Sequence, residues 1–181
     1  FWPWLNRSTA SVMSDISLLV LLPFLAAVGA AATPRTSGIW GLTATALTAA
    51  IALWLTLDVL QDGARSIAIG GWVAPLGIVF VADGLAALML LMTSGVGVIV
   101  AIQAASWGIL SSSCASKDAE SLRAGFWPLW LSTLGAMNAL FLSGDLFNIY
   151  VAFEILGLTA VGLTALSGTR SALRAAFDYL S

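Results

Sequence analysis

The sequence lacks histidine, has a single cysteine and carries few charged residues. Without histidine there can be no His-ligated haem, no Ser-His-Asp triad and no His-containing zinc site. One cysteine, Cys114, allows neither an internal disulfide bond nor an all-cysteine iron–sulfur cluster. We therefore expect no bound cofactor and no metal site.

The shortage of charge is matched by an excess of apolar residues. Charged residues make up 9 % of the chain and apolar residues 60 %, against about 25 % and roughly 45–50 % in ordinary soluble domains. So few charges could not cover the surface of a water-soluble globule, and so many apolar residues exclude a disordered chain. The net charge of −2 offers no basic patch for nucleic acid. The composition predicts an integral membrane protein whose main surroundings are the lipid bilayer.

Five apolar runs are long enough, or nearly so, to cross a bilayer as helices. A helix needs about 20 residues to span a hydrocarbon core of ~30 Å. The runs cover residues 16–32, 39–57, 78–106, 127–142 and 146–166, and residues 170–181 look like the start of a sixth helix. The expected fold class is an all-α integral membrane protein. The first run could instead be a signal peptide with a cleavage site near Ala32, but four further runs follow it.

These runs divide the chain into four parts. Residues 1–14 form an N-terminal extension, in which Met13 is a candidate initiator, and residues 15–106 hold the first three membrane helices. Residues 107–125 are expected to be a polar cytoplasmic loop, and residues 126–181 hold the fourth and fifth runs and the start of the sixth helix. The chain opens on Phe1 and ends abruptly at Ser181, which indicates a fragment of a longer polypeptide.

A short β-hairpin is predicted at residues 64–76, between the second and third membrane helices. Ile67 and Ile69 alternate with small residues, and Gly70 and Gly71 offer a two-residue turn. The tryptophans lie mostly near the ends of runs, where interfacial anchors are found. We expect this role for Trp2, Trp4, Trp40, Trp54, Trp72, Trp107, Trp127 and Trp130.

The basic residues predict an orientation. With five crossings, Arg7 and Arg65 lie on one side of the membrane, and five basic residues lie on the other: Arg35, Lys117, Arg123, Arg170 and Arg174. Because positive charge is enriched in cytoplasmic loops, the second side should be cytoplasmic. The N-terminus is then outside.

Glu154 is the charged residue that lipid should tolerate least. It lies eight residues into the fifth run, about 12 Å along that helix and near the middle of the bilayer. A charge there costs at least ~2.5–3.5 kcal/mol on insertion scales, unless the carboxyl is protonated, hydrated or paired. A buried carboxyl with a raised pKa can load and release protons, so Glu154 is our candidate proton carrier. The alternative is a protonated glutamate that makes one structural hydrogen bond between helices.

Four other residues are candidates for the same proton path. Tyr150 lies one helical turn before Glu154, and Asn138 is a polar residue within the fourth run. Asn138 could bond the carboxyl or tie two helices together. Asp145 could guide ions at the outer mouth of the path, or it could cap the fifth helix. Asp83 could have either a structural or a functional role.

The sequence around Glu154 resembles a known signature. Residues 144–156, GDLFNIYVAFEIL, are similar to the fifth-helix motif of proton-conducting membrane subunits. This superfamily includes antiporter-like subunits of respiratory complex I and of membrane-bound hydrogenases, and the A-type and D-type subunits of Mrp-type Na+/H+ antiporters. Residues 70–85, GGWVAPLGIVFVADGL, resemble the D-type branch. The likeness covers most of residues 15–181.

The resemblance implies the N-terminal part of a fold of ~14 helices with two inverted five-helix repeats. It also implies that residues 126–181 are the start of the proton-translocating repeat. The family's fifth-helix glutamate matches Glu154, and the lysine that works with it on helix seven would fall after Ser181. It also implies other membrane subunits as partners, H+ and Na+ as transported ions, and the bacterial inner membrane as location.

Two functions from different classes compete. The first is a subunit of a multisubunit Na+/H+ antiporter, a transporter and not an enzyme. The alternative is a proton-pumping membrane subunit of an NADH-quinone oxidoreductase or membrane-bound hydrogenase complex. The absence of histidine and of cysteine clusters fits both.

Overall fold

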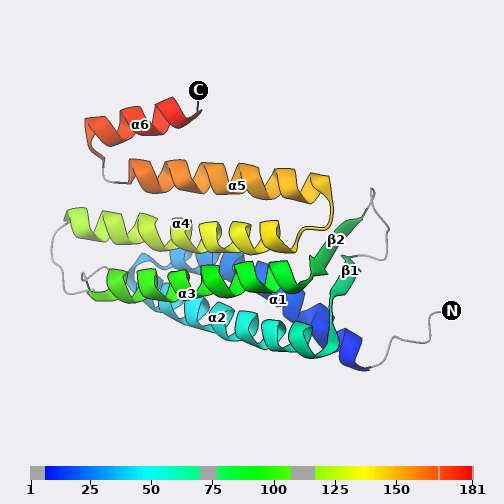
Figure 1. Cartoon of the computed structure of the whole chain (residues 1–181). Coiled ribbons are helices and arrows are strands. Elements are labelled where there is room, and N and C mark those ends of the chain that lie inside the picture. Colours follow the sequence, from blue (N-terminus) through cyan, green and yellow to red (C-terminus); the bar gives the residue numbers. More distant parts are fainter. Residues whose placement is uncertain (1–6, 70–76, 107–116, 167, 181) are drawn as a thin grey trace.

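A computed structural model describes residues 7–69, 77–106, 117–166 and 168–180 of the chain. The described residues form long helices and one small β-hairpin (Figure 1). In chain order the elements are α1 (Arg7–Ala32), a short 3-10 turn η1 (Pro34–Thr36), α2 (Ser37–Asp62), β1 (Arg65–Ile69), β2 (Ile78–Ala82), α3 (Gly84–Ser106), α4 (Lys117–Leu142), α5 (Leu146–Ala165) and α6 (Arg170–Leu180). The expected all-helical class is thus confirmed in its main features.

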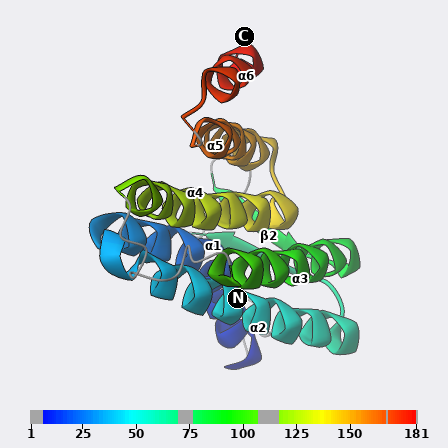
Figure 2. The same ribbon diagram turned by 90° about the vertical axis from the view of Figure 1, so that its left-hand side faces the viewer.

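The long helices run side by side in alternating directions, with α4 at the centre (Figure 1). It packs on α1, α2 and α3 on one side and on α5 on the other. Figure 2 shows α5 beyond α4, and α6 beyond α5. α5 therefore packs on both α4 and α6, and the part of its surface that carries Glu154 is left exposed.

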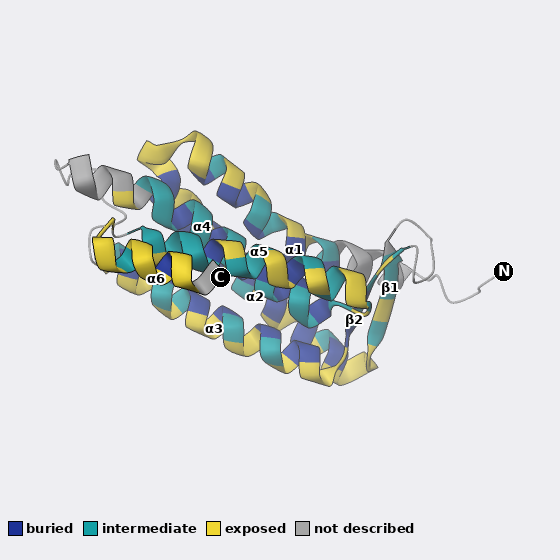
Figure 3. Ribbon diagram, turned by 90° about the horizontal axis from the view of Figure 1, so that it is seen from above, coloured by how far each residue is buried: buried dark blue, intermediate teal, exposed yellow. Residues whose placement is uncertain are grey.

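Four of the helices are long and apolar enough to cross a membrane: α1 from Asp15, α2, α3 and α5. Exposed residues follow the outward faces of these helices (Figure 3). Many of them are large and apolar, such as Leu25, Leu60 and Ile99, each more than 60 % exposed. Apolar patches of this extent suit lipid, not water. The fourth predicted run lies in α4, which is not among the four candidate spans. Pro128 and Asn138 lower its hydropathy, and its central position leaves little of it to face lipid.

The predicted polar loop at residues 107–125 is partly wrong. Residues 117–125 are the first turns of α4, which begins ten residues before the apolar run at Trp127. Residues 107–116, with Cys114, lie outside the described part of the chain. This part of the helix was not predicted because the prediction rested on the continuous apolar run, and four charged residues interrupt the sequence before it: Lys117, Asp118, Glu120 and Arg123.

The predicted hairpin exists, but its second strand begins beyond the predicted range. β1 pairs antiparallel with β2, with Arg65 opposite Ala82 and Ile69 opposite Ile78. Eight residues separate the paired residues Ile69 and Ile78, and the predicted turn residues Gly70 and Gly71 lie outside the described part of the chain. The second strand comes from the start of the third apolar run, so that α3 begins only at Gly84. A continuous apolar run does not distinguish a buried strand from a helix.

Trp127 is a core residue and not the interfacial anchor that its position suggests. It is fully buried and lies against the backbone of Gly41 on α2, where an added Cβ would come within 1.8 Å of the indole ring. The ring also contacts Phe126 edge to face. In contrast, Trp40 and Trp54 are exposed, as anchors would be. Trp2, Trp4, Trp72 and Trp107 lie outside the described residues.

The contact between Trp127 and Gly41 predicts that a side chain larger than that of glycine at position 41 lowers the stability of the fold. Gly41→Ala should lower the thermal midpoint of the purified full-length protein by several degrees, because overpacking a filled core costs about 1–3 kcal/mol. Gly95→Ala is the matched control, since its added Cβ meets nothing within 4 Å. Equal midpoints for the two variants in detergent melting curves would show that the indole can move aside without cost.

Candidate proton site

Glu154 lies in the middle of α5. It is the ninth of the 20 residues of this helix, which Asp145 caps and which ends at Ala165. The helix forms because the run from Leu146 onward contains no proline and only one interior charge, Glu154 itself. The position halfway along a candidate membrane span matches the depth expected from the sequence.

The side chain of Glu154 lies on the face of α5 that no described helix covers. The residue is exposed, whereas Ala152 and Thr159 on the opposite face are buried. There is also open space at Gly157, one turn further along, since an added Cβ there would meet nothing within 4 Å. No described residue therefore packs closely against Gly157. On the covered side it is Gly162 that approaches α4, where its added Cβ would lie 2.8 Å from Leu129.

Tyr150 is the polar neighbour of Glu154. Its phenol hydroxyl lies near the carboxylate, from one turn earlier on the same helix, and the residue is 63 % exposed. A tyrosine hydroxyl can donate to a carboxylate and accept from a carboxylic acid. The two side chains can therefore form a hydrogen bond whether Glu154 is charged or protonated.

Asp145 joins three segments of the chain. One carboxylate oxygen accepts a hydrogen bond from the backbone N–H of Asn148 at 2.7 Å, which caps α5. The other accepts from the backbone N–H of Val79 on β2 at 3.1 Å. Gly144 N–H donates to the carbonyl of Val79, and Ser143 forms a bridge with Phe80. The predicted cap is confirmed, and the same side chain also fixes α5 to the hairpin.

Asp83 has a similar but smaller role at the start of α3. It accepts one hydrogen bond, from the backbone N–H of Ala86 at 2.8 Å, and the residue is exposed. This geometry is that of a helix cap, which is the structural one of the two roles considered for Asp83.

Asn138 connects α4 to α1. Its amide nitrogen donates to the backbone carbonyl of Leu19 at 2.9 Å, and the residue is fully buried. Gly135 also faces α1, where an added Cβ would lie 3.0 Å from Phe24. Asn138 thus bonds α1 and not Glu154. This is the alternative in which the residue ties two helices together. The amide oxygen has no partner among the described residues.

A charge cluster at the hairpin end was missed by sequence reasoning. Arg65 pairs with Asp62 at 2.7 Å and approaches Asp58 at 3.7 Å, and the carboxylate of Asp15 on α1 lies near Asp58. Asp58 and Asp62 are four residues apart, which places them on one face of α2. This spacing was the signal in the sequence that could have revealed the cluster. Within the described ranges, no group of three or more side chains is arranged to hold a metal ion.

Comparisons with known proteins agree with the resemblance. No protein-family model matches the chain. The D-type subunit of the Na+/H+ antiporter of Alkalihalophilus pseudofirmus is 35 % identical over 130 residues, which cover 72 % of this chain and 24 % of that protein. The chain thus spans about a quarter of the length of this relative.

Solved structures show the same fold. The Mrp complex from Dietzia sp. matches with a TM-score of 0.79 and 25 % identity, over 93 % of this chain and 31 % of the matched chain. The membrane-bound sulfane sulfur reductase, an archaeal respiratory membrane complex, matches with a TM-score of 0.75 and 25 % identity, over 91 % and 33 % of the two chains. Two kinds of complex therefore contain this arrangement of helices.

Because Asp145 accepts two hydrogen bonds, we expect it to stabilise the fold more than an ordinary helix cap does. Asp145→Ala should lower the free energy of unfolding by more than the ~0.5–2 kcal/mol of a lost cap, because the N–H of Val79 also loses its partner. Asp83→Ala, which removes one such bond, is the control and should cost less. Thermal melting of the full-length protein compares the two. A smaller shift for Asp145→Ala would mean that the hairpin and α5 are joined by other contacts.

Proposed function

Because this chain belongs to the Mrp-type antiporter subunit superfamily, we propose that it is part of a multisubunit antiporter exchanging Na+ for H+ across a bacterial membrane. The relative from Alkalihalophilus pseudofirmus is named for these two ions. The partners in this proposal are other membrane subunits, and the whole complex provides the activity.

The observation that carries the proposal is the position of Glu154. The residue is halfway along a membrane-spanning helix, on a face that the described part of the chain leaves uncovered. A charged carboxylate facing lipid at this depth would be costly. A following segment of the full-length protein, or a partner subunit, would cover this face and surround the carboxyl. This is where the superfamily's partner lysine would lie.

The proposed chemistry is the binding and release of one proton at the carboxyl of Glu154. In apolar surroundings the carboxyl keeps its proton, whereas a nearby cation favours the carboxylate. Approach of an ammonium group or of Na+ would expel the proton, and its departure would allow another to bind. Tyr150 would hold the carboxyl in position in both states. The side chains of Asp145, Asp83 and Asn138 form hydrogen bonds with backbone groups. We therefore assign the proton to Glu154, with Tyr150 beside it.

A second function is favoured by one specific observation. The respiratory sulfane sulfur reductase complex has nearly the same fold similarity as the Mrp complex. In such a complex the same glutamate would move protons driven by electron transfer elsewhere. Purification of the assembly distinguishes the two, because iron–sulfur subunits would accompany the chain only in the second case.

The proposal predicts that the charge of Glu154 is essential for transport. Glu154→Gln in the full-length assembly should abolish Na+-dependent proton flux, because an amide cannot release a proton. Tyr150→Phe should reduce the flux only in part, since the carboxyl remains. Flux is measured with a pH-sensitive dye in inverted membrane vesicles.

Asp62→Asn is the matched control for this experiment. It removes a carboxylate that lies at the end of α2, exposed and paired with Arg65, and it should leave the flux unchanged. Normal flux in a stably assembled Glu154→Gln variant would refute the proposed role.

The orientation belongs to the same proposal, with the N-terminus and the hairpin outside and η1 in the cytoplasm. Cysteines introduced at Thr36 and at Gly63 test it, because both positions are exposed at opposite ends of α2. In a Cys114→Ser background, a membrane-impermeant maleimide added to intact cells should label the cysteine at position 63 and not the one at position 36. The reverse labelling would invert the orientation.

A further inference from the structure

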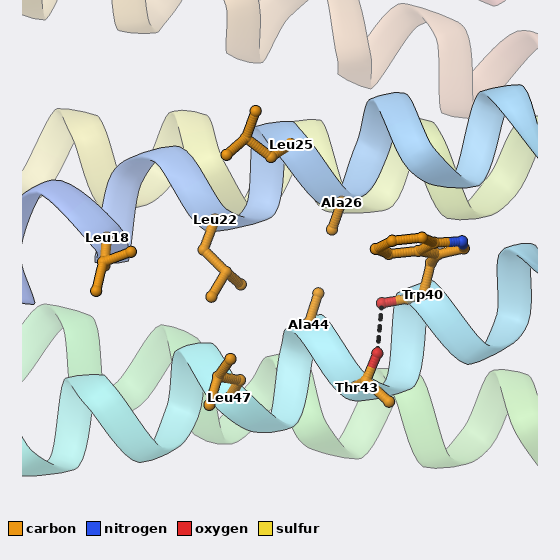
Figure 4. Close-up of a pocket in the computed structure, with 8 residues that line it drawn as sticks. All are labelled: Leu18, Leu22, Leu25, Ala26, Trp40, Thr43, Ala44 and Leu47. Atoms are coloured by element: carbon orange, nitrogen blue, oxygen red, sulfur yellow. Dashed lines mark hydrogen bonds between the residues drawn. The ribbon is translucent and has the colours of Figure 1, made fainter.

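A groove runs between α1 and α2 on the outer surface of the bundle (Figure 4). Its volume is about 400 Å³, and its lining is formed by Leu18, Leu22, Leu25, Ala26, Trp40, Thr43, Ala44 and Leu47. Ala26 and Ala44 face each other across it and are only 5 % exposed, which makes them its floor. The leucines and the indole of Trp40 form its walls.

One end of the groove is held in a fixed shape. The indole N–H of Trp40 donates a hydrogen bond to the hydroxyl of Thr33 at 3.1 Å. The ring lies so close to Gly29 that an added Cβ there would be 3.1 Å from it. The ring is therefore held in place before any ligand binds, which lowers the entropy cost of binding.

A free positive charge lies at the same end. Arg35 belongs to η1, five residues before Trp40, and is exposed. Among the residues that the structure describes, both ion pairs involve Arg65 and neither involves Arg35. Basic residues at the membrane surface attract anionic lipid head groups. Leu47 lies seven residues beyond Trp40, about 10 Å along the helix, so the groove extends over a depth that fits within one leaflet of a ~30 Å core.

We propose that this groove binds an anionic phospholipid, with one acyl chain between α1 and α2 and the phosphate at Arg35. An acyl chain suits the groove better than another helix does. Membrane helices pack closely through exposed ridges of small residues, but here the two alanines are recessed beneath leucine side chains. A flexible chain can follow such walls. This inference concerns a different face from that of Glu154 and is independent of the proposed transport function.

The test uses the full-length protein in nanodiscs that contain phosphatidylglycerol with a photoreactive group in its acyl chain. After illumination, labelled residues are mapped by mass spectrometry. Label should concentrate on the lining residues of α1 and α2. Arg35→Gln should reduce it several-fold with phosphatidylglycerol and leave it unchanged with a phosphatidylcholine probe. Arg174→Gln, which removes an exposed arginine on α6, is the matched control and should have no effect.

A second variant tests the groove itself without disturbing its floor. Thr43 lies at the exposed edge, so Thr43→Trp should fill the groove and remove the label with either lipid. Thr164→Trp, at an exposed site on α5, should not. Equal labelling of the exposed residues Ile99 and Ile102 on α3 would overturn the proposal in favour of general lipid contact. Protection of the groove from every lipid probe in the assembled complex would overturn it in favour of a partner helix.

Discussion

The free energy of placing a carboxylate in lipid is the constraint on which the rest of this structure depends. Glu154 lies halfway along α5, where an unpaired charge costs at least ~2.5–3.5 kcal/mol. α5 packs on α4 and α6, and neither helix covers Glu154, which is exposed. Tyr150 is exposed beside it, and Gly157 has open space around it. In the proposed function, a further membrane segment covers this face and surrounds the carboxyl.

The described contacts fix where that face lies. Asn138 and Gly135 hold α4 against α1, and Trp127 fills the space above Gly41. α5 then packs on the far side of α4, with Gly162 against Leu129. Asp145 bonds both the first turn of α5 and the hairpin strand β2, so the start of the helix cannot shift along α4 without breaking these bonds. The position of Glu154 along the bundle is thereby fixed by contacts at the hairpin end of α5.

Much of this arrangement could be predicted from the sequence, and the errors have physical causes. Apolar runs located the long helices because hydropathy measures the cost of each segment in lipid, and the cap at Asp145 followed from a charged residue just before a run. The second hairpin strand was missed because residues 78–82 are as apolar as the helix that follows. The start of α4 was missed because four of the seven residues 117–123 are charged.

The buried role of Trp127 and the direction of Asn138 depend on which helix faces which, and a single sequence does not contain that information. Their partners, Gly41 and Leu19, are 86 and 119 residues away in the chain. The open face around Glu154 is likewise a property of packing. Periodicity alone places Tyr150 and Gly157 near Glu154 on the helix, but it does not say which face of α5 meets α4.

The protonation of Glu154 in the assembled membrane is the most direct test of this account. Hydrophobic carbodiimides react with protonated carboxyl groups in apolar surroundings, and mass spectrometry measures the modified fraction at each site. The account predicts that Glu154 is modified in the full-length complex, that modification decreases as the pH rises, and that Na+ protects the site. An unmodified Glu154 at every pH, with intact transport, would contradict it.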